Sequence, residues 1–288
     1  MILFLKALQF CFGLIFRAPA GVSLAVMRAA SWTVYTVARL TRLKRNVVAD
    51  IKLVMPDSPA EAVADRLIKN TSDTIFEILC VPFFQPEHYQ AIFKWEGLEH
   101  VDRALKAGKG VIMLTMHFGN YESPANALAR RGYKISSILK ATDEPYFEII
   151  NNSRRVGGIN LINVLEDNMY TETLKALARN DMVYILADTG ALESRHEYFD
   201  FLGHKVPVAT GWLTLAQRAG CPVIPTLSRR EDGVNLVTFF PPVTVSRDNR
   251  EAVMQSVGKT FEGFVKQYPE NWAMFLNPYE TKRMVEGK

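Results

Sequence analysis

The sequence predicts an α/β fold with a mixed, largely parallel sheet, helices on both faces, and a membrane-associated helical segment before it. Two patterns lead to this fold class: an apolar N-terminal stretch, and an alternation of strand-like and helix-like segments from residue 92 onward. Short apolar runs occupy 92–95, 111–116, 134–139, 160–165 and 182–187, with helical segments near 99–107, 121–131, 144–155 and 168–179. Such alternation is typical of parallel strands joined by helices.

The first 38 residues are almost entirely apolar or small, and they predict a retained membrane element. Four cations interrupt them at intervals of eleven residues: Lys6, Arg17, Arg28 and Arg39. Eleven residues is close to three helical turns, so in a single helix these cations would form one stripe. Pro19 and Gly21 predict a break into two pieces.

The topology of this element stays open at the sequence level. A helix on the membrane surface and a spanning helix are both considered, although no uninterrupted apolar run reaches the roughly 20 residues that a bilayer core requires. The alternative is an amphipathic helix buried in the protein. A basic cluster at 39–45 places the following residues on the cytoplasmic side by the positive-inside rule.

We divide the chain into a membrane segment (1–45), a helical connection (46–91) that packs on the catalytic domain, and the catalytic domain itself (92–288). Ser58 and Glu61 have the spacing of a capping box, which predicts a helix running from there to Cys80. Near the C-terminus, we expect a helix near 249–267 and a segment NWAMFL, 271–276, that completes the sheet or its edge.

Composition limits the partners and cofactors. The three cysteines are scattered without metal-binding spacing, so we predict neither a disulfide nor a structural metal. The formal charge of +4 is compatible with an anionic membrane surface or an acidic carrier protein, and we expect no nucleic acid partner.

The stretch VIMLTMHFGNYE, residues 111–122, contains the candidate catalytic residues. An apolar strand ends just before His117, and Glu122 follows five positions later. A histidine is the usual general base near neutral pH, and a carboxylate on its second ring nitrogen would hold its tautomer. The pair could instead be caps of a strand-to-helix turn.

Neither a serine nor a cysteine nucleophile accompanies this pair. The sequence contains no G-x-S-x-G, and no cysteine adjoins a histidine, which argues against an esterase or thioesterase. We therefore expect the histidine to remove a proton from a substrate.

The stretch GKGVIMLTMHFGNYE, residues 108–122, resembles the H-x4-D/E block of the bacterial lysophospholipid acyltransferase-like superfamily. Its HFGNYE form is most similar to the lipid A late acyltransferases, the lauroyl/myristoyl transferase branch. The similarity extends to KWEGLEHVDRALKAGKG before it and to residues 199–225 after it. In that family the histidine and the acidic residue are the catalytic pair, which here implies His117 and Glu122.

This resemblance implies a membrane-associated O-acyltransferase of the bacterial inner membrane, with its catalytic domain facing the cytoplasm. The fatty acyl group would come from a thioester, acyl-carrier protein or coenzyme A, which serves as substrate rather than cofactor. The acceptor would be a hydroxyl of a glycolipid such as a lipid A precursor. The alternatives are a glycerolipid acyltransferase that uses lysophosphatidate, and a non-catalytic membrane lipid-binding protein on the same scaffold.

Arg154 and Arg155 end a predicted helix, where they could bind a carboxylate or phosphate or simply complement the helix C-terminus. The resemblance implies that Arg154 serves the active site. It also implies a supporting role for Asp188 at the end of the run VYILAD, although the family's usual D-Q-D is here Asp188, Thr189 and Gly190. An aspartate at a strand end can also be the cap of the next helix.

Backbone N–H groups near Gly119 and Asn120 are candidates for stabilising the developing oxyanion. Residues 197–210 are expected to form two strands around a turn at Gly203. In the family this block helps to form the acyl-chain pocket, which implies that Phe199, Phe201 and Leu202 line it. The same residues could be ordinary core.

Overall fold

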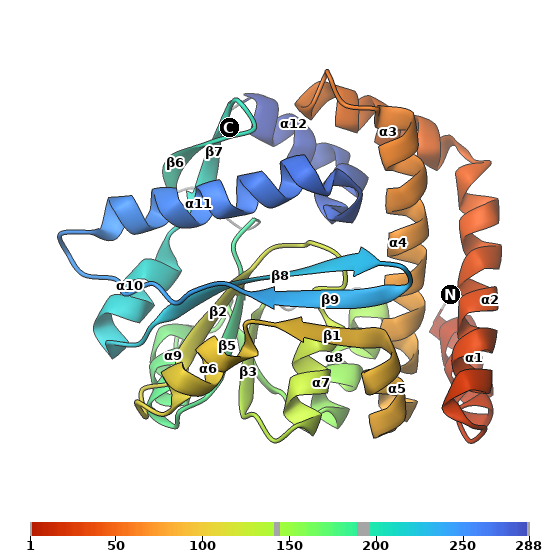
Figure 1. Cartoon of the computed structure of the whole chain (residues 1–288), viewed down its shortest axis with the longest axis horizontal. Coiled ribbons are helices and arrows are strands. Elements are labelled where there is room, and N and C mark those ends of the chain that lie inside the picture. The colour runs from red at the N-terminus through yellow and green to blue at the C-terminus, as the bar shows by residue number, and fades with distance from the viewer. Residues whose placement is uncertain (1, 141–144, 189–195, 287–288) are drawn as a thin grey trace.

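The computed structural model describes residues 2–140, 145–188 and 196–286 (Figure 1). Its strands are β1 Phe93–Glu96, β2 Val111–Thr115, β3 Ile135–Leu139, β4 Asn160–Asn163, β5 Met182–Leu186, β6 His196–Phe201, β7 His204–Ala209, β8 Val223–Glu231 and β9 Val234–Phe239. Its α-helices are α1 Ile2–Ile15, α2 Ala20–Arg39, α3 Arg42–Val54, α4 Ala60–Cys80, α5 Pro86–Ile92, α6 Leu98–Leu105, α7 Ser123–Arg130, α8 Pro145–Val156, α9 Met169–Ala178, α10 Gly211–Ala219, α11 Arg250–Gln267 and α12 Pro278–Glu286.

Seven of these strands form one mixed sheet in the order β1-β9-β8-β2-β5-β3-β4. All neighbouring pairs are parallel except β8 and β9, which form an antiparallel hairpin. The five apolar runs predicted from the sequence are β1 to β5, so the largely parallel α/β sheet is confirmed. β6 and β7 form a separate antiparallel hairpin, with its turn at Leu202 and Gly203.

The central strand β2 is buried on both faces of the sheet. A strand covered on both sides reads as a continuous apolar run rather than an alternating one, which explains the sequence VIMLT. Because successive side chains point to opposite faces, Ile112 and Leu114 join one core cluster, while Val111 and Met113 join the other. The first cluster lies under α3, α10 and α11, and the second under α5, α6 and α7. Helices therefore cover both faces, as predicted.

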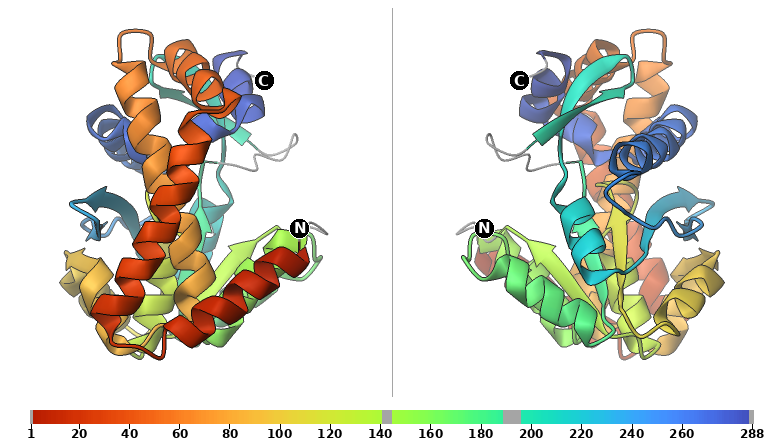
Figure 2. Two further views of the ribbon diagram at one scale, coloured as in Figure 1. Left: turned by 90° about the vertical axis from the view of Figure 1, so that its right-hand side faces the viewer. Right: turned by 90° about the vertical axis from the view of Figure 1, so that its left-hand side faces the viewer.

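The N-terminal residues form two helices rather than one. The chain bends between Ile15 and Ala20, where Pro19 cannot continue a helix, and α1 turns away from α2 (Figure 2). The break agrees with the prediction, but it also means that the four cations do not share one stripe. Lys6 belongs to α1, Arg17 lies in the bend, and only Arg28 and Arg39 share α2.

Within the described residues, no helix has both the length and the apolar character needed to cross a membrane. Helix α2 lies beside α4, with α4 between it and the sheet (Figure 1). Polar contacts join them: Ser31 Oγ donates to Asp73 Oδ1 at 2.5 Å, Tyr35 Oη donates to Asp65 Oδ2 at 2.7 Å, and Arg39 pairs with Asp65 at 3.6 Å. The N-terminal helices are thus part of the folded domain.

Two local predictions were wrong. Ser58 is no capping residue, because its hydroxyl donates to the carbonyl of Met55 and α4 begins at Ala60 without a side-chain cap. The segment NWAMFL joins no sheet; it forms two 3-10 turns, and Trp272 makes a single bridge to Phe118. Helix α3 runs through residue 45, and the division of the chain into three regions stays a prediction.

Candidate active site

The register of β2 and β5 brings two separate parts of the sequence together. Thr115 is paired with Leu186, and the N–H of Ala187 donates to the carbonyl of Thr115 at 2.8 Å. The parallel chains therefore leave the sheet side by side, and the residues that follow meet at its carboxyl edge. His117 and Asp188 lie at this edge, where α/β proteins usually bind their ligands.

Asp188 is the hydrogen-bond partner of the His117 ring. Its Oδ1 lies 2.8 Å from His117 Nδ1, while its Oδ2 accepts from the His117 backbone N–H at 2.9 Å. The indole Nε1 of Trp272 donates to the same Oδ2 at 3.1 Å. Because an ionised carboxylate only accepts hydrogen bonds, the neutral form of the ring carries its proton on Nδ1 and keeps a lone pair on Nε2. This is the tautomer that a general base requires.

The surroundings of His117 favour its protonated form. Burial of the ring opposes the charge, but the charge and hydrogen bond of Asp188 and the charges of Glu122 and Glu280 outweigh burial, so the pKa of His117 is raised above its usual value. A raised pKa makes the imidazole a stronger base, which suits it to take a proton from a weakly acidic hydroxyl.

Glu122 does not bind the His117 ring as expected from the H-x4-E spacing. Both of its carboxylate oxygens bind Arg154: Nε donates to Oε2 at 2.9 Å, and Nη2 donates to Oε1. Arg154 Nη1 also donates to Asn151 Oδ1 at 3.1 Å. The turn after His117 carries Glu122 to the start of α7, facing α8, and the register of β5 supplies the carboxylate for the imidazole instead.

Arg154 therefore uses its planar fork to bind Glu122 inside the protein, and its expected role at the active site stays a prediction. The Glu122–Arg154 ion pair lines a hollow of about 280 Å³, together with Ser137 and Tyr184. Arg155 lies on the surface, where it pairs with Glu148 of the same helix at 2.9 Å. Its side chain is 53% exposed, which fits a charge near a helix C-terminus rather than a substrate ligand.

Gly119 and Asn120 shape the turn after His117. The Gly119 N–H donates to the carbonyl of Asn271 at 2.6 Å, so this group, one of the candidate oxyanion donors, is already bonded within the protein. The N–H groups of His117 and Phe118 are bonded as well, and a role for the Asn120 N–H stays a prediction. Gly119 has φ of 59°, and a Cβ there would lie 1.9 Å from the carbonyl oxygen of Ser228. Only glycine fits this position.

A large apolar cavity begins beside Asp188. It has a volume of about 800 Å³, part of it open to solvent, and its walls come from β2, β6, β7, α10, α11 and α12. Phe199 and Phe201 line it, and the expectation that it holds an acyl chain stays a prediction. Leu202 is not among its described lining residues, because it sits in the β6–β7 turn with φ of 53°.

One wall of this cavity depends on the glycine at position 258 of α11. A Cβ at Gly258 would lie 2.2 Å from Cζ of Phe199, well inside van der Waals contact. The absence of a side chain on α11 therefore lets the Phe199 ring occupy its place in the wall. Gly263 on the same helix has no described atom within 4 Å of a Cβ.

Two residues of the site were missed by sequence analysis. Trp272 binds Asp188, and Glu280 of α12 lines the cavity, pairs with Arg283 at 3.3 Å, and contributes to the raised pKa of His117. Both lie more than 80 positions after Asp188 in the sequence, and no spacing links them to it. Thr189 and Gly190, which depart from the family's D-Q-D, lie outside the described residues.

A histidine base bound to a buried aspartate, at the edge of an α/β sheet and beside an apolar cavity, defines a site suited to proton removal next to a long apolar group. The comparison of sequences gives the family. The chain belongs to the bacterial lipid A biosynthesis acyltransferases, whose family model matches residues 8–281. It is therefore an acyltransferase.

Curated relatives agree with this family at low identity. A lipid A biosynthesis acyltransferase from Haemophilus influenzae is 22% identical over 228 residues, which cover 77% of this chain and 70% of the relative. A phosphatidylinositol mannoside acyltransferase from Mycobacterium tuberculosis strain H37Rv is 23% identical over 194 residues, covering 67% of this chain and 61% of that protein. The relatives thus differ in the acceptors that their names state.

Asp188→Asn should lower the pKa of His117, because the substitution removes the charge that does most to stabilise the imidazolium. Glu122→Gln should lower the same pKa by less, since Glu122 is neutralised by Arg154 and has no hydrogen bond to the ring. NMR titration of the His117 ring in both variants measures the two effects. A larger fall in Glu122→Gln would contradict the assignment of Asp188 as the partner.

Proposed function

We propose that this chain is an O-acyltransferase of the membrane, which moves a fatty acyl group from a thioester to a hydroxyl of a glycolipid. The observation that carries the proposal is the His117–Asp188 hydrogen bond, at 2.8 Å, beside a cavity with mainly apolar walls. Family membership supports acyl transfer, and the geometry supports a base at the place where an acyl chain could end.

In this proposal, His117 Nε2 takes the proton from the acceptor hydroxyl as its oxygen attacks the thioester carbonyl. The tetrahedral intermediate then expels the thiolate, and the imidazolium returns the proton to the departing sulfur. Asp188 holds the tautomer and stabilises the imidazolium, as the aspartate of a hydrolase triad does. Glu122 and Arg154 act as an ion pair that shapes the turn, and the Glu122 carboxylate makes a smaller contribution than Asp188 to the raised pKa of His117.

The acyl chain would occupy the cavity lined by Phe199 and Phe201, with its thioester at the Asp188 end. We propose acyl-carrier protein as the donor, on the basis of the family resemblance, and coenzyme A as the alternative. The acceptor is proposed at the level of a glycolipid, because the relatives are named for lipid A and for phosphatidylinositol mannoside. A lipid A precursor is the leading candidate.

We propose that α2 lies on the surface of the bacterial inner membrane. Its outward face exposes Val22, Val26 and Val37, which are four and eleven residues apart and so share one side of the helix. Trp32 is also exposed, as suits a membrane–water interface, and Arg28 is a nearby cation. The basic cluster at 39–45 supports a catalytic domain on the cytoplasmic side.

Two alternatives are separated from this proposal by lipid analysis. A glycerolipid acyltransferase would add acyl mass to phospholipids rather than to a glycolipid, and a non-catalytic lipid binder would add none. Mass spectrometry of total lipids from cells with and without the chain identifies the acceptor class and the acyl group together. An unchanged glycolipid fraction would overturn the glycolipid acceptor.

His117→Ala should lower kcat/KM for acyl transfer by about 10²–10⁴-fold, the usual contribution of a general base. The wild-type rate should also fall as the pH is lowered through the pKa of His117, which is raised above the ordinary value of about 6.5. The protonated ring cannot accept a proton from the acceptor hydroxyl. The measurement uses an acyl-carrier-protein donor. His100→Ala is the control, since His100 lies on α6, contacts Arg103, and takes part neither in the His117–Asp188 contact nor in the lining of the cavity.

A folded His117→Ala enzyme within about tenfold of the wild-type rate would contradict the mechanism. Circular dichroism and thermal melting establish that each variant is folded. A wild-type profile without loss of rate on the acid side would likewise argue against His117 as the base.

Gly258→Ala should shift the preference of the enzyme toward shorter acyl chains. The added methyl group overlaps the Phe199 ring, so the ring must move, and the space beside it is the cavity. Competition among donors of increasing chain length measures the shift. Gly263→Ala on the same helix has room for its methyl group, so it should leave the chain-length preference unchanged. Alanine has a higher helix propensity than glycine, so this control should not destabilise α11. Equal chain-length preferences in the two variants would contradict the proposal that the acyl chain binds in this cavity.

The triple variant Val22→Ser, Val26→Ser and Val37→Ser should bind lipid vesicles more weakly, whatever their charge, because it removes apolar area from the face proposed to enter the interface. Arg28→Gln should weaken binding to anionic vesicles more than to neutral ones. Leu165→Ser is the matched control, since Leu165 is 61% exposed but lies between β4 and α9. Cosedimentation with vesicles measures binding, and an equal loss in the control would contradict this orientation.

A further inference from the structure

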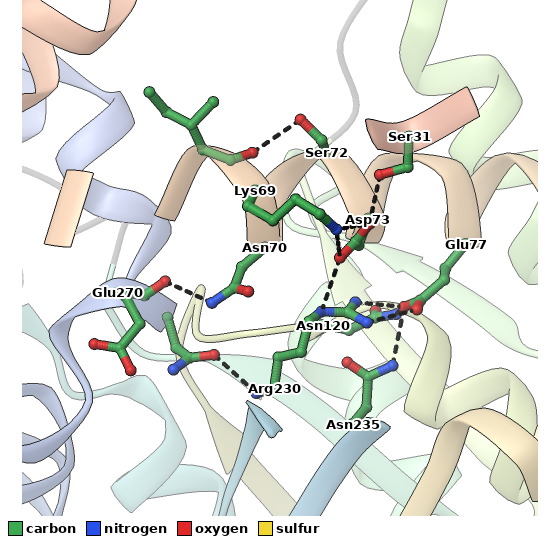
Figure 3. A network of polar contacts seen from close by, with 12 residues as sticks. Ser31, Lys69, Asn70, Ser72, Asp73, Glu77, Asn120, Arg230, Asn235 and Glu270 are labelled. Atoms are coloured by element: carbon green, nitrogen blue, oxygen red, sulfur yellow. Dashed lines mark hydrogen bonds and ion pairs between the residues drawn. The ribbon is translucent and has the colours of Figure 1, made fainter. Parts of the chain in front are cut away.

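A buried network of charged and polar side chains lies beneath the turn that follows His117 (Figure 3). At its centre is the carboxylate of Glu77, on α4, which is 2% exposed. Arg230, near the end of β8, binds it with both terminal nitrogens at 2.8 Å. The ion pair joins the helical layer that carries α2 to the sheet that carries the candidate site.

The position of Glu77 requires a carboxylate. Its Oε2 accepts three hydrogen bonds, from Arg230 at 2.8 Å, from Asn120 Nδ2 at 2.6 Å and from Asn235 Nδ2 at 2.9 Å, while Oε1 accepts a fourth from Arg230. A glutamine would direct its NH₂ group at one of these donors in either orientation. Burial of an ion pair is costly, and the cost falls to the extent that all its polar atoms are satisfied.

Glu77 and Arg230 reach the turn after His117 by two routes. Through the side chain, Asn120 donates to Glu77 and its Oδ1 accepts from the N–H of Ser123 at 2.9 Å, at the start of α7. Through the backbone, the Arg230 N–H donates to Asn271 Oδ1 at 2.8 Å, and the Asn271 carbonyl accepts from the N–H of Gly119 at 2.6 Å. The turn is thus held on one side by the carboxylate of Glu77, through Asn120, and on the other by the main chain of Arg230, through Asn271.

The network continues from the ion pair toward α2. Arg230 Nε lies 3.9 Å from Asp73 Oδ2, and Asp73 binds Lys69 and Ser31. Asp73 lies on the same helix as Glu77, one turn earlier, and is also buried. Among the described residues, Asp73 makes neither a hydrogen bond nor an ion pair with the turn after His117, so the two carboxylates differ in what they can affect.

We propose that Glu77 and Arg230 are positioning residues: they fix the turn from Phe118 to Glu122, through Asn120 and Asn271, and so keep His117 in register with Asp188. This inference rests on the proposed function, because it assumes that His117 is the base. Neither residue touches the reacting groups. Their effect reaches the chemistry through the backbone of the turn, and a displacement of about 1 Å at a catalytic group can cost 10²-fold in rate.

The test compares Glu77→Gln with Asp73→Asn, which are isosteric changes of buried carboxylates one helical turn apart. Both variants should lose stability, since each weakens the network. Glu77→Gln should also lower kcat by about 10- to 100-fold with little change in KM, and should speed hydrogen exchange of the amides of residues 117–122. Asp73→Asn should keep kcat within about threefold of wild type and leave exchange of those amides nearly unchanged.

The inference fails if Glu77→Gln keeps the wild-type kcat, or if both variants lose activity only in proportion to their loss of stability. His117→Ala is measured alongside to keep the two proposals apart. An active His117→Ala enzyme would overturn the proposed base and leave the exchange result to decide whether Glu77 orders the turn. An inactive His117→Ala enzyme, together with equal kcat values and equal amide exchange in Glu77→Gln and Asp73→Asn, would overturn only the positioning role.

A double variant covers the case in which Glu77→Gln does not fold. Glu77→Met with Arg230→Met removes both charges, which often restores the stability lost when one partner of a buried pair is removed. Asn120 nevertheless loses its acceptor in this variant. A folded double variant with low kcat and fast exchange at 117–122 supports positioning, and a folded one with wild-type kcat overturns it.

Discussion

The hydrogen bond between His117 and Asp188 is the interaction on which the geometry of the candidate site depends. It exists because β2 and β5 are adjacent parallel strands in a register that pairs Thr115 with Leu186. A slip of one residue would turn each side chain to the opposite face of the sheet and separate the imidazole from its carboxylate. Apolar packing on both faces of β2 specifies this register, so the core of the protein sets the geometry of its chemistry.

The turn between β2 and α7 is fixed from several directions. Trp272 and Asn271 contact it from the 3-10 turns, Arg154 binds its acidic residue from α8, and the Glu77–Arg230 pair holds Asn120 from below. The left-handed conformation of Gly119 allows the close approach of β8 that these contacts need. The H-x4-E motif therefore specifies a turn that other parts of the protein hold in place. It also sets the positions of one basic and one acidic side chain.

The two faces of the sheet support different parts of the candidate site. The face that carries Leu114 and Met116 opens into the apolar cavity, whereas the other face supports the Glu122–Arg154 pair. The N-terminal helices are joined to the site through α4, whose side chains reach both α2 and the turn. Helix α4 thus contacts both the helix proposed to lie on the membrane and the turn of the candidate site.

The sequence alone determined the order of the strands along the chain, the break at Pro19, the presence of His117 and Asp188 at strand ends, and the resemblance to an acyltransferase family. Local patterns carry this information, because burial on two faces, the fixed φ of proline and short motifs are all properties of neighbouring residues. The cavity residues Phe199 and Phe201 were also identified through the resemblance. Tertiary structure alone decided which carboxylate binds the imidazole: spacing favoured Glu122, whereas the strand register placed Asp188 there and Arg154 on Glu122. It likewise decided the roles of Trp272, Glu280 and Glu77, because their contacts join segments that are distant in sequence and that only the packed sheet and helices bring together.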